Sequence, residues 1–209
     1  LNENISSIEL LNTITKPSNY LNKITIVEGW SKNELNRELS KFFENFTETP
    51  YEDIIADTYF FEKNEDFFSF LDNLRTIKKK NFYNYKEKSI FDTYSSEDIM
   101  IIGSLLEKEG LDYNDKIKIS SVIFNRLNKN MFLQIDATVL FAITNGTYDL
   151  NRNLLRSDLK INHPFNTYKN KGLPPKPISY VGKKTIEILF ENYKSEFMFY
   201  FFDKSLNRH

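Results

Sequence analysis

The 209-residue sequence contains no cysteine and only two histidines, His163 and His209. The absence of cysteine excludes disulfides, thiolate metal sites and thiol catalysis. Two histidines are too few for a typical zinc site built on imidazole ligands, and we read His163 as structural. The sequence therefore predicts a protein that uses no metal and no other cofactor.

The sequence also lacks a strong net charge and a long apolar run. Its 28 basic and 29 acidic residues give a net charge of -1, which does not favour a nucleic-acid partner and suits a neutral or carbohydrate ligand better. No stretch reaches the roughly 20 apolar residues that span a bilayer. With 40% hydrophobic and 15% aromatic residues, the chain is long enough for a substantial core and for two domains.

The N-terminal part reads as a strand, a turn and a helix. The β-branched run Ile24 to Val27 predicts a short strand, and Gly29 predicts the turn that follows it. Ser31 with Glu34 three residues later is typical of a capping box at a helix start. We expect this unit to belong to a small N-terminal domain.

Further along, apolar spacing places Leu35 and Leu39 on the inner face of that helix, and Tyr59 to Phe61 predicts an aromatic strand. The charged run 75–89 shows no apolar period, so we expect a solvated connector or an exposed hairpin. The run FMFYFFD, residues 197–203, predicts a buried strand.

A helix of about 14 residues is predicted to begin at Ser95 or Ser96 and to end at Gly110 in a left-handed conformation. At 100° per residue, four of its side chains form one apolar stripe: Ile99, Ile102, Leu105 and Leu106. An apolar helix of this kind is expected to pack in the core.

The end of this helix carries the triplet Glu107, Lys108 and Glu109. Lys108 is expected to face water, Glu109 to project into the apolar stripe, and Glu107 to project at its margin. Gly103 and Ser104 are small and lie one turn before Glu107. We expect them to leave room for a ligand to approach Glu107.

Two interpretations of the triplet stay open on geometry alone. In the structural one, Glu109 is a core carboxylate paired with an arginine such as Arg126, and Glu107 is an ordinary edge residue. In the functional one, Glu107 is partly desolvated, so that its carboxyl group can hold a proton and donate it.

Five sequence blocks then indicate a family. They are EKE (107–109), NRL (125–127), LQIDATV (133–139), FNTY (165–168) and GLPPKPI (172–178). In this order they resemble the MltG/YceG endolytic murein transglycosylases, and ITIVEGWS and IIADTYFF extend the resemblance toward the N-terminus. The sequence departs from the family pattern at Ala137, where the family has proline, at Lys176, where it has glycine, and at Tyr180-Val181-Gly182, where it usually has Asn-Pro-Gly.

The resemblance implies an α+β fold, with a small LysM-like N-terminal domain over residues 21–80. A mixed α/β catalytic domain over residues 90–209 would then carry the glutamate helix at its cleft. The implied activity is a lyase reaction on peptidoglycan, which cleaves the bond between N-acetylmuramic acid and N-acetylglucosamine and leaves 1,6-anhydro ends. The first glutamate of the triplet, Glu107, is implied to be catalytic. One carboxyl group suffices if the muramic acid 6-hydroxyl attacks, because no water must be activated.

Several polar side chains are candidates for substrate binding, since amides and phenols bind sugar hydroxyl and acetamido groups. The candidates are Gln134, Asp136, Asn166, Tyr168, Asn125 and Ser104. Asp136 precedes a short helix that ends at Asn145-Gly146, so helix capping is its default role. As the alternative, Asp136 is the second carboxylate of a muramidase-type hydrolase. Asn125 and Arg126 have a structural interpretation as anchors of helix ends.

A third alternative is a non-catalytic peptidoglycan-binding module that acts through its LysM-like segment. For the enzyme, the resemblance implies glycan strands as substrate and penicillin-binding proteins of wall synthesis as partners. It also implies an N-terminal membrane helix that this chain does not contain. We therefore expect the full-length protein in the inner membrane, with the catalytic region on the periplasmic or extracytoplasmic side.

Overall fold

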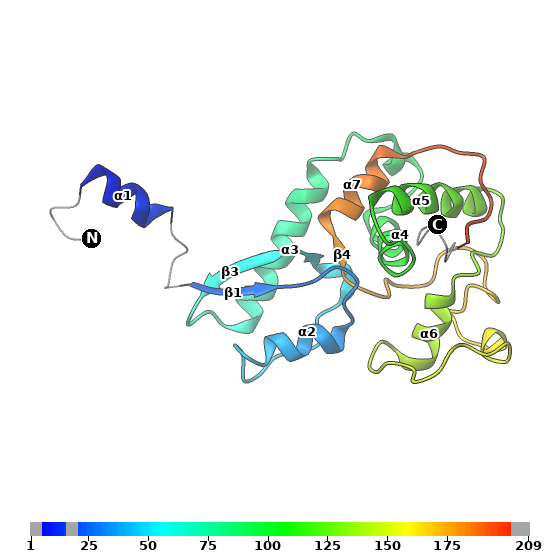
Figure 1. Ribbon diagram of the computed structural model, residues 1–209, viewed down its shortest axis with the longest axis horizontal. Coiled ribbons are helices and arrows are strands. Elements are labelled where there is room, and N and C mark those ends of the chain that lie inside the picture. Colours follow the sequence, from blue (N-terminus) through cyan, green and yellow to red (C-terminus); the bar gives the residue numbers. More distant parts are fainter. Residues whose placement is uncertain (1–5, 16–20, 202–209) are drawn as a thin grey trace.

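The computed structural model describes residues 6–15 and 21–201, and within them it has a mixed α/β fold (Figure 1). The α-helices are α1 (Ser7–Ile14), α2 (Lys32–Leu39), α3 (Phe67–Tyr83), α4 (Ser96–Glu109), α5 (Tyr113–Asn128), α6 (Asp136–Thr144) and α7 (Lys183–Glu191). The strands are β1 (Leu21–Thr25), β2 (Ile55–Ala56), β3 (Thr58–Glu62) and β4 (Val181–Gly182). Short 3-10 helices cover Tyr51–Asp53, Ser89–Asp92 and Asp158–Lys160.

The strands form two small sheets. β1 pairs antiparallel with β3, with Leu21 opposite Glu62 and Thr25 opposite Thr58. β2 pairs in parallel with β4, with Ile55 opposite Val181. The second pair joins segments about 125 residues apart and so ties the N-terminal part of the chain to the C-terminal part.

The N-terminal core forms under the β1–β3 sheet. Leu35 and Leu39 of α2 are fully buried, as predicted, and the Ser31 capping box with Glu34 is present. Their neighbours in this cluster include Ile24, Ile26, Phe43, Phe61, Phe67, Phe70, Leu71 and Leu74. The expected aromatic strand is β3, and the first strand, β1, begins three residues earlier than predicted and ends at Thr25.

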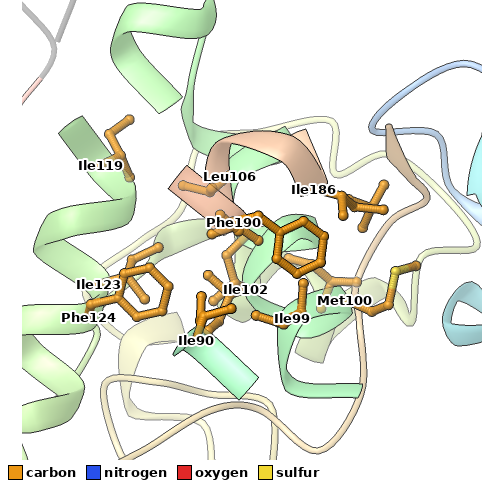
Figure 2. Packing of buried hydrophobic residues seen from close by; sticks show 14 of the residues in the cluster. Ile90, Ile99, Met100, Ile102, Leu106, Ile119, Ile123, Phe124, Ile186 and Phe190 are labelled. Carbon is orange, nitrogen blue, oxygen red and sulfur yellow. The ribbon is translucent and has the colours of Figure 1, made fainter. Parts of the chain in front are cut away.

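The second core is helical, and α4 lies at its centre. Figure 2 shows Ile99, Met100 and Ile102 of α4 packed near Ile119 and Ile123 of α5 and Ile186 and Phe190 of α7. Eight consecutive residues of α4, 99 to 106, are buried. The helix is therefore covered on every side along most of its length, and its orientation is fixed.

Tyr180 joins the two cores. It precedes β4 but packs in the N-terminal cluster, where its ring lies 4.8 Å from that of Tyr51. Its hydroxyl donates to the Thr49 carbonyl at 2.7 Å. Its backbone also accepts a hydrogen bond from Gly29 and donates one to Trp30, at 2.9 and 3.0 Å.

The predictions for two segments, 75–89 and 197–203, are wrong over the residues that the structure describes. Much of the charged run 75–89 is the second half of α3, whose buried residues Leu71, Leu74 and Phe82 continue the helical period while the charged side chains cover the outer face. Residues 197–201 are neither a strand nor buried. Phe197, Phe199 and Phe201 are exposed, whereas Met198 and Tyr200 are half-buried.

The structure confirms the mixed α/β class. The LysM-like character of the N-terminal part and the division into residues 21–80 and 90–209 remain predictions. Residues 202–209, which include His209, lie outside the described residues.

Candidate active site

The helix that carries the acidic triplet begins as predicted but ends differently. Ser95 is the N-cap, and its hydroxyl and backbone N–H form a capping box with Asp98. Gly110 has φ -88° and ψ 132°, so the expected left-handed conformation is wrong. Glycine is required for space instead, because a Cβ at this position would lie 2.4 Å from Cγ of Lys116 and 3.2 Å from its backbone.

The Glu107 side chain is buried and joins three helices. Its side chain is 2% exposed and forms an ion pair with Lys116 of α5, which is itself 13% exposed. The other carboxylate oxygen accepts a hydrogen bond from the Gly182 N–H at the start of α7, at 2.9 Å. Lys116 also donates to the Thr185 hydroxyl in the first turn of α7, at 3.0 Å. Glu107 therefore holds α4, α5 and α7 together.

The space that we expected beside Glu107 is filled by protein. A Cβ on Gly103 would lie 2.6 Å from a methyl group of Val181, so this glycine lets β4 approach α4 closely. Ser104 is fully buried, and its hydroxyl accepts a hydrogen bond from the Ile178 N–H at 3.0 Å. The prediction that Gly103 and Ser104 leave room for a ligand is therefore wrong, and Ser104 fixes the chain that leads into β4.

Glu109 is half-buried, and a different set of residues surrounds it. The Tyr200 hydroxyl donates to Glu109 at 3.0 Å. Burial raises the pKa of Tyr200, and the charge of Glu109 raises it further. The phenol therefore stays protonated at neutral pH and acts as a donor to the carboxylate.

Asp136 and Tyr168 form a second carboxylate–phenol pair near the first. The Tyr168 hydroxyl donates to Asp136 at 2.6 Å. Burial, the hydrogen bond to Asp136 and the charge of Glu109 all raise the pKa of Tyr168. Glu109 and Asp136 thus act on the same phenol, and we call Glu109, Asp136, Tyr168 and Tyr200 the carboxylate–tyrosine cluster.

Asp136 is not the helix cap that we expected. The N-cap of α6 is Ile135, which makes no side-chain capping bond, and Asp136 is the first helical residue. Its carboxylate is exposed and bonded to Tyr168 instead. It is thus available to a ligand that also reaches Tyr168.

Three other residues that we predicted to contact the substrate do not belong to the carboxylate–tyrosine cluster. The Asn166 side chain is fully buried and donates to the carbonyls of Leu159 and Ile161, so it fixes its own loop. Asn125 donates to the carbonyls of Ser195 and Phe197 and so holds the segment after α7. Gln134 is exposed, with φ 53°, and its backbone N–H bonds the Thr167 carbonyl.

Sequence reasoning did not identify Tyr200, and it considered Arg126 only as a partner of Glu109 or as an anchor of helix ends. Arg126 is buried and donates to the carbonyls of Met198 and Leu133, at 2.7 and 2.6 Å. Its guanidinium lies 4.9 Å from the ring centre of Phe199. These contacts place Tyr200 against Glu109, and the uniformly apolar run over 197–201 gave no sequence signal for this role.

In the parts of the chain that are described, 6–15 and 21–201, no group of acidic and histidine side chains is arranged to hold a metal ion. His163 accepts a hydrogen bond from the Phe165 N–H and lies beside that ring, which is a structural role. No helix in the same ranges is long and apolar enough to cross a membrane.

The profile of the YceG-like family matches residues 1–209, and the chain belongs to this family. The endolytic murein transglycosylase of Bacillus subtilis (strain 168) is 39% identical over 131 residues, which cover 62% of this chain and 35% of the relative. The protein of the same name from Streptococcus pneumoniae serotype 2 is 30% identical over 149 residues, 70% of this chain and 27% of the relative. The chain therefore spans about a third of the length of the curated relatives it matches.

A crystal structure of a yceG-like protein from Listeria monocytogenes has the same fold. It superposes with a TM-score of 0.74 at 22% sequence identity, over 95% of this chain and 74% of that chain. The likeness extends over both cores.

Proposed function

We propose that this protein is an endolytic lytic transglycosylase, which cuts peptidoglycan glycan strands between N-acetylmuramic acid and N-acetylglucosamine. The observation that carries the proposal is the carboxylate–tyrosine cluster, in which half-buried Glu109 is held by Tyr200 beside Asp136 and Tyr168. Membership of the YceG-like family and relatives named endolytic murein transglycosylases support the same activity.

The proton donor in this proposal is Glu109 and not Glu107. A general acid must touch the leaving oxygen, so the substrate must be able to reach its carboxyl group. The Glu107 side chain is 2% exposed and ion-paired with Lys116, so the substrate cannot reach its carboxylate. Glu109 is half-buried, and it accepts a hydrogen bond from the Tyr200 phenol, which orients its carboxyl group. The sequence alone favours Glu107 for this role, both through the small residues one turn before it and through the family resemblance.

The reaction needs one carboxyl group, which acts first as the acid and then as the base. Glu109 gives its proton to the glycosidic oxygen as the bond from that oxygen to the anomeric carbon breaks. The 6-hydroxyl of the same muramic acid forms the new bond to the anomeric carbon, and the Glu109 carboxylate takes the hydroxyl proton. No water is consumed, and the product carries a 1,6-anhydro end. Asp136 lies where its charge could stabilise the positive charge that develops on the sugar.

The exposed Asp136 carboxylate also favours a second candidate, a muramidase-type hydrolase. Glycosidases that use water or a covalent intermediate need a second carboxylate near the acid. Asp136 is free of a capping role and acts on the same tyrosine as Glu109. In a hydrolase, Asp136 would be the base or the nucleophile, and each cut would leave a reducing end.

The products distinguish the candidates. Purified protein is incubated with uncrosslinked glycan strands, and the fragments are weighed by mass spectrometry. We expect fragments of several disaccharides with 1,6-anhydro ends, each one water lighter than a hydrolysis product. Reducing ends alone would establish the hydrolase. Strands that are bound but stay intact would favour a non-catalytic binding module.

We also propose that the full-length protein is anchored in the membrane, with this region on the extracytoplasmic side, where peptidoglycan lies. In that location it would act on strands made by penicillin-binding proteins. The family resemblance and the nature of the substrate support this location. Co-purification of the full-length protein with penicillin-binding proteins tests the partnership.

A further inference from the structure

A cavity of about 410 Å³ lies between α2 and α6. The two helices lie along the same side of the molecule in Figure 1. The cavity is lined by residues of α2, by Lys108 of α4, by α6 and by the turn that follows it. Its volume falls in the range of about 300 to 1,000 Å³ that is usual for ligand sites.

The cavity and the proposed catalytic centre draw residues from the same two helices, α4 and α6. Lys108 lines it, and the next residue is Glu109. Ala137 lines it, and the residue before is Asp136. Consecutive Cα atoms are about 3.8 Å apart. A glycan strand bound at Glu109 and Asp136 would therefore place its neighbouring groups in this cavity.

The walls of the cavity differ in character. Ile178, Leu140 and Phe141 give an apolar floor that suits the face of a sugar ring. Asn33 lines the other side and donates to the Thr147 carbonyl at 3.2 Å, which joins α2 to the turn after α6. The site is therefore closed at this end by a defined contact.

Four charged side chains line the cavity: Arg37, Lys108, Glu34 and Asp149. The Glu34 carboxylate accepts hydrogen bonds from the N–H and hydroxyl of Ser31 at the start of α2, where the helix dipole offsets its charge. Arg37 and Lys108 are exposed, and no ion pair is recorded for either within residues 6–15 and 21–201. The cavity thus offers two cations against one exposed carboxylate, that of Asp149.

We infer that this cavity binds the peptide stem on a sugar next to the cleavage site, with stem carboxylates paired to Lys108 and Arg37. The inference rests on the proposed function, since it is the glycan strand that supplies the stem. A stem peptide carries more carboxylates than amines, which matches two cations and one acid. The apolar floor takes the sugar and the lactyl group to which the stem is attached. Lys108 thereby selects strands that carry stems. It lies in the sequence between Glu107 and Glu109, which have other roles.

The test compares two substrates. Uncrosslinked strands with intact stems and the same strands stripped of stems by an amidase are digested by wild-type protein, Lys108→Gln, Arg37→Gln and the double variant. Lys118→Gln is the control, because Lys118 is also exposed on a helix but does not line the cavity. The three changed side chains, Arg37, Lys108 and Lys118, are all exposed, so thermal unfolding should show unchanged folds.

We expect the double variant to raise KM for stem-bearing strands about fivefold, the combined effect of two exposed charge pairs. Its kcat should stay the same, and its KM for stripped strands should stay within about twofold of wild type. Raising the salt to about 0.5 M should reduce the wild-type preference for stems, because it screens exposed charges. An equal rise of KM on both substrates, or no rise on either, would overturn the inference.

A separate measurement keeps the inference independent of the activity. If wild-type protein cuts neither substrate, the proposed function fails, and binding of a stem-bearing disaccharide is measured by calorimetry instead. Weaker binding by the double variant than by Lys118→Gln would then support the stem site. Equal binding by both would refute it.

Discussion

Exchanging glutamate for glutamine at positions 107 and 109 should separate the structural carboxylate from the chemical one. Glu109→Gln keeps an oxygen that can accept the Tyr200 hydrogen bond, so the fold should stay intact. It removes the acidic proton, and loss of a general acid costs about 100-fold to 10,000-fold in rate. We expect kcat to fall at least about 100-fold, with unchanged strand binding and little change in Tm.

Glu107→Gln should have the opposite pattern. It leaves the Lys116 ammonium, 13% exposed, without its carboxylate. Breaking a buried pair on one side costs about 3 to 5 kcal/mol, and for a chain of this size that lowers Tm by roughly 6 to 20 °C. Activity per folded molecule, measured well below the new Tm, should stay within about tenfold of wild type. Adding Lys116→Met should restore much of the stability, since both charges are then gone.

Strand digestion followed by chromatography gives the rates, and circular dichroism gives Tm. A Glu107→Gln protein with normal Tm but a 100-fold loss of rate, beside an active Glu109→Gln protein, would refute the assignment. It would make Glu107 the proton donor, as the family resemblance implies.

Three further outcomes are expected. Asp136→Asn should reduce the rate about tenfold and keep the 1,6-anhydro ends, because Asp136 only stabilises charge. A loss of 100-fold or more, together with reducing ends in the products of the wild type, would make Asp136 the second carboxylate of a hydrolase. Tyr180→Phe should lower the free energy of unfolding in urea by about 1 to 3 kcal/mol, because it leaves the buried Thr49 carbonyl without its donor, whereas Tyr83→Phe at an exposed site should change nothing. Protease added to spheroplasts should degrade this region of the full-length protein, and protection until lysis would contradict the extracytoplasmic location.

Local signals predicted much of the fold. Ser31 with Glu34 and Ser95 with Asp98 specify helix starts through bonds that span three residues, so the sequence shows them directly. The buried face of α2 follows from the helical period in the same way. The connector prediction failed because the window 75–89 began inside a helix whose apolar residues mostly come earlier.

The candidate site was harder to predict, because distant segments determine it. The helical period gives the direction of Glu107 and Glu109 around α4 but not what covers each direction. Glu107 is covered by Lys116 and by Gly182, which lies 75 residues further along the chain. Tyr200, 91 residues away, covers Glu109. Asp136 missed the cap position by one residue, a difference that sequence patterns do not resolve.

The triplet at the end of α4 also requires a fixed number of residues between the Ser95 cap and Glu107. Its three charged side chains face the Lys116 pair, the cavity and Tyr200 in turn, because each residue is rotated by about 100° from the last. Deleting one residue between the Ser95 cap and the triplet would turn each triplet side chain into the direction of the residue before it. Lys108 would then face Lys116, and Glu109 would face the cavity, so the ion pair and the proposed proton donor would be lost together. We therefore expect α4 to tolerate substitutions far more readily than insertions or deletions.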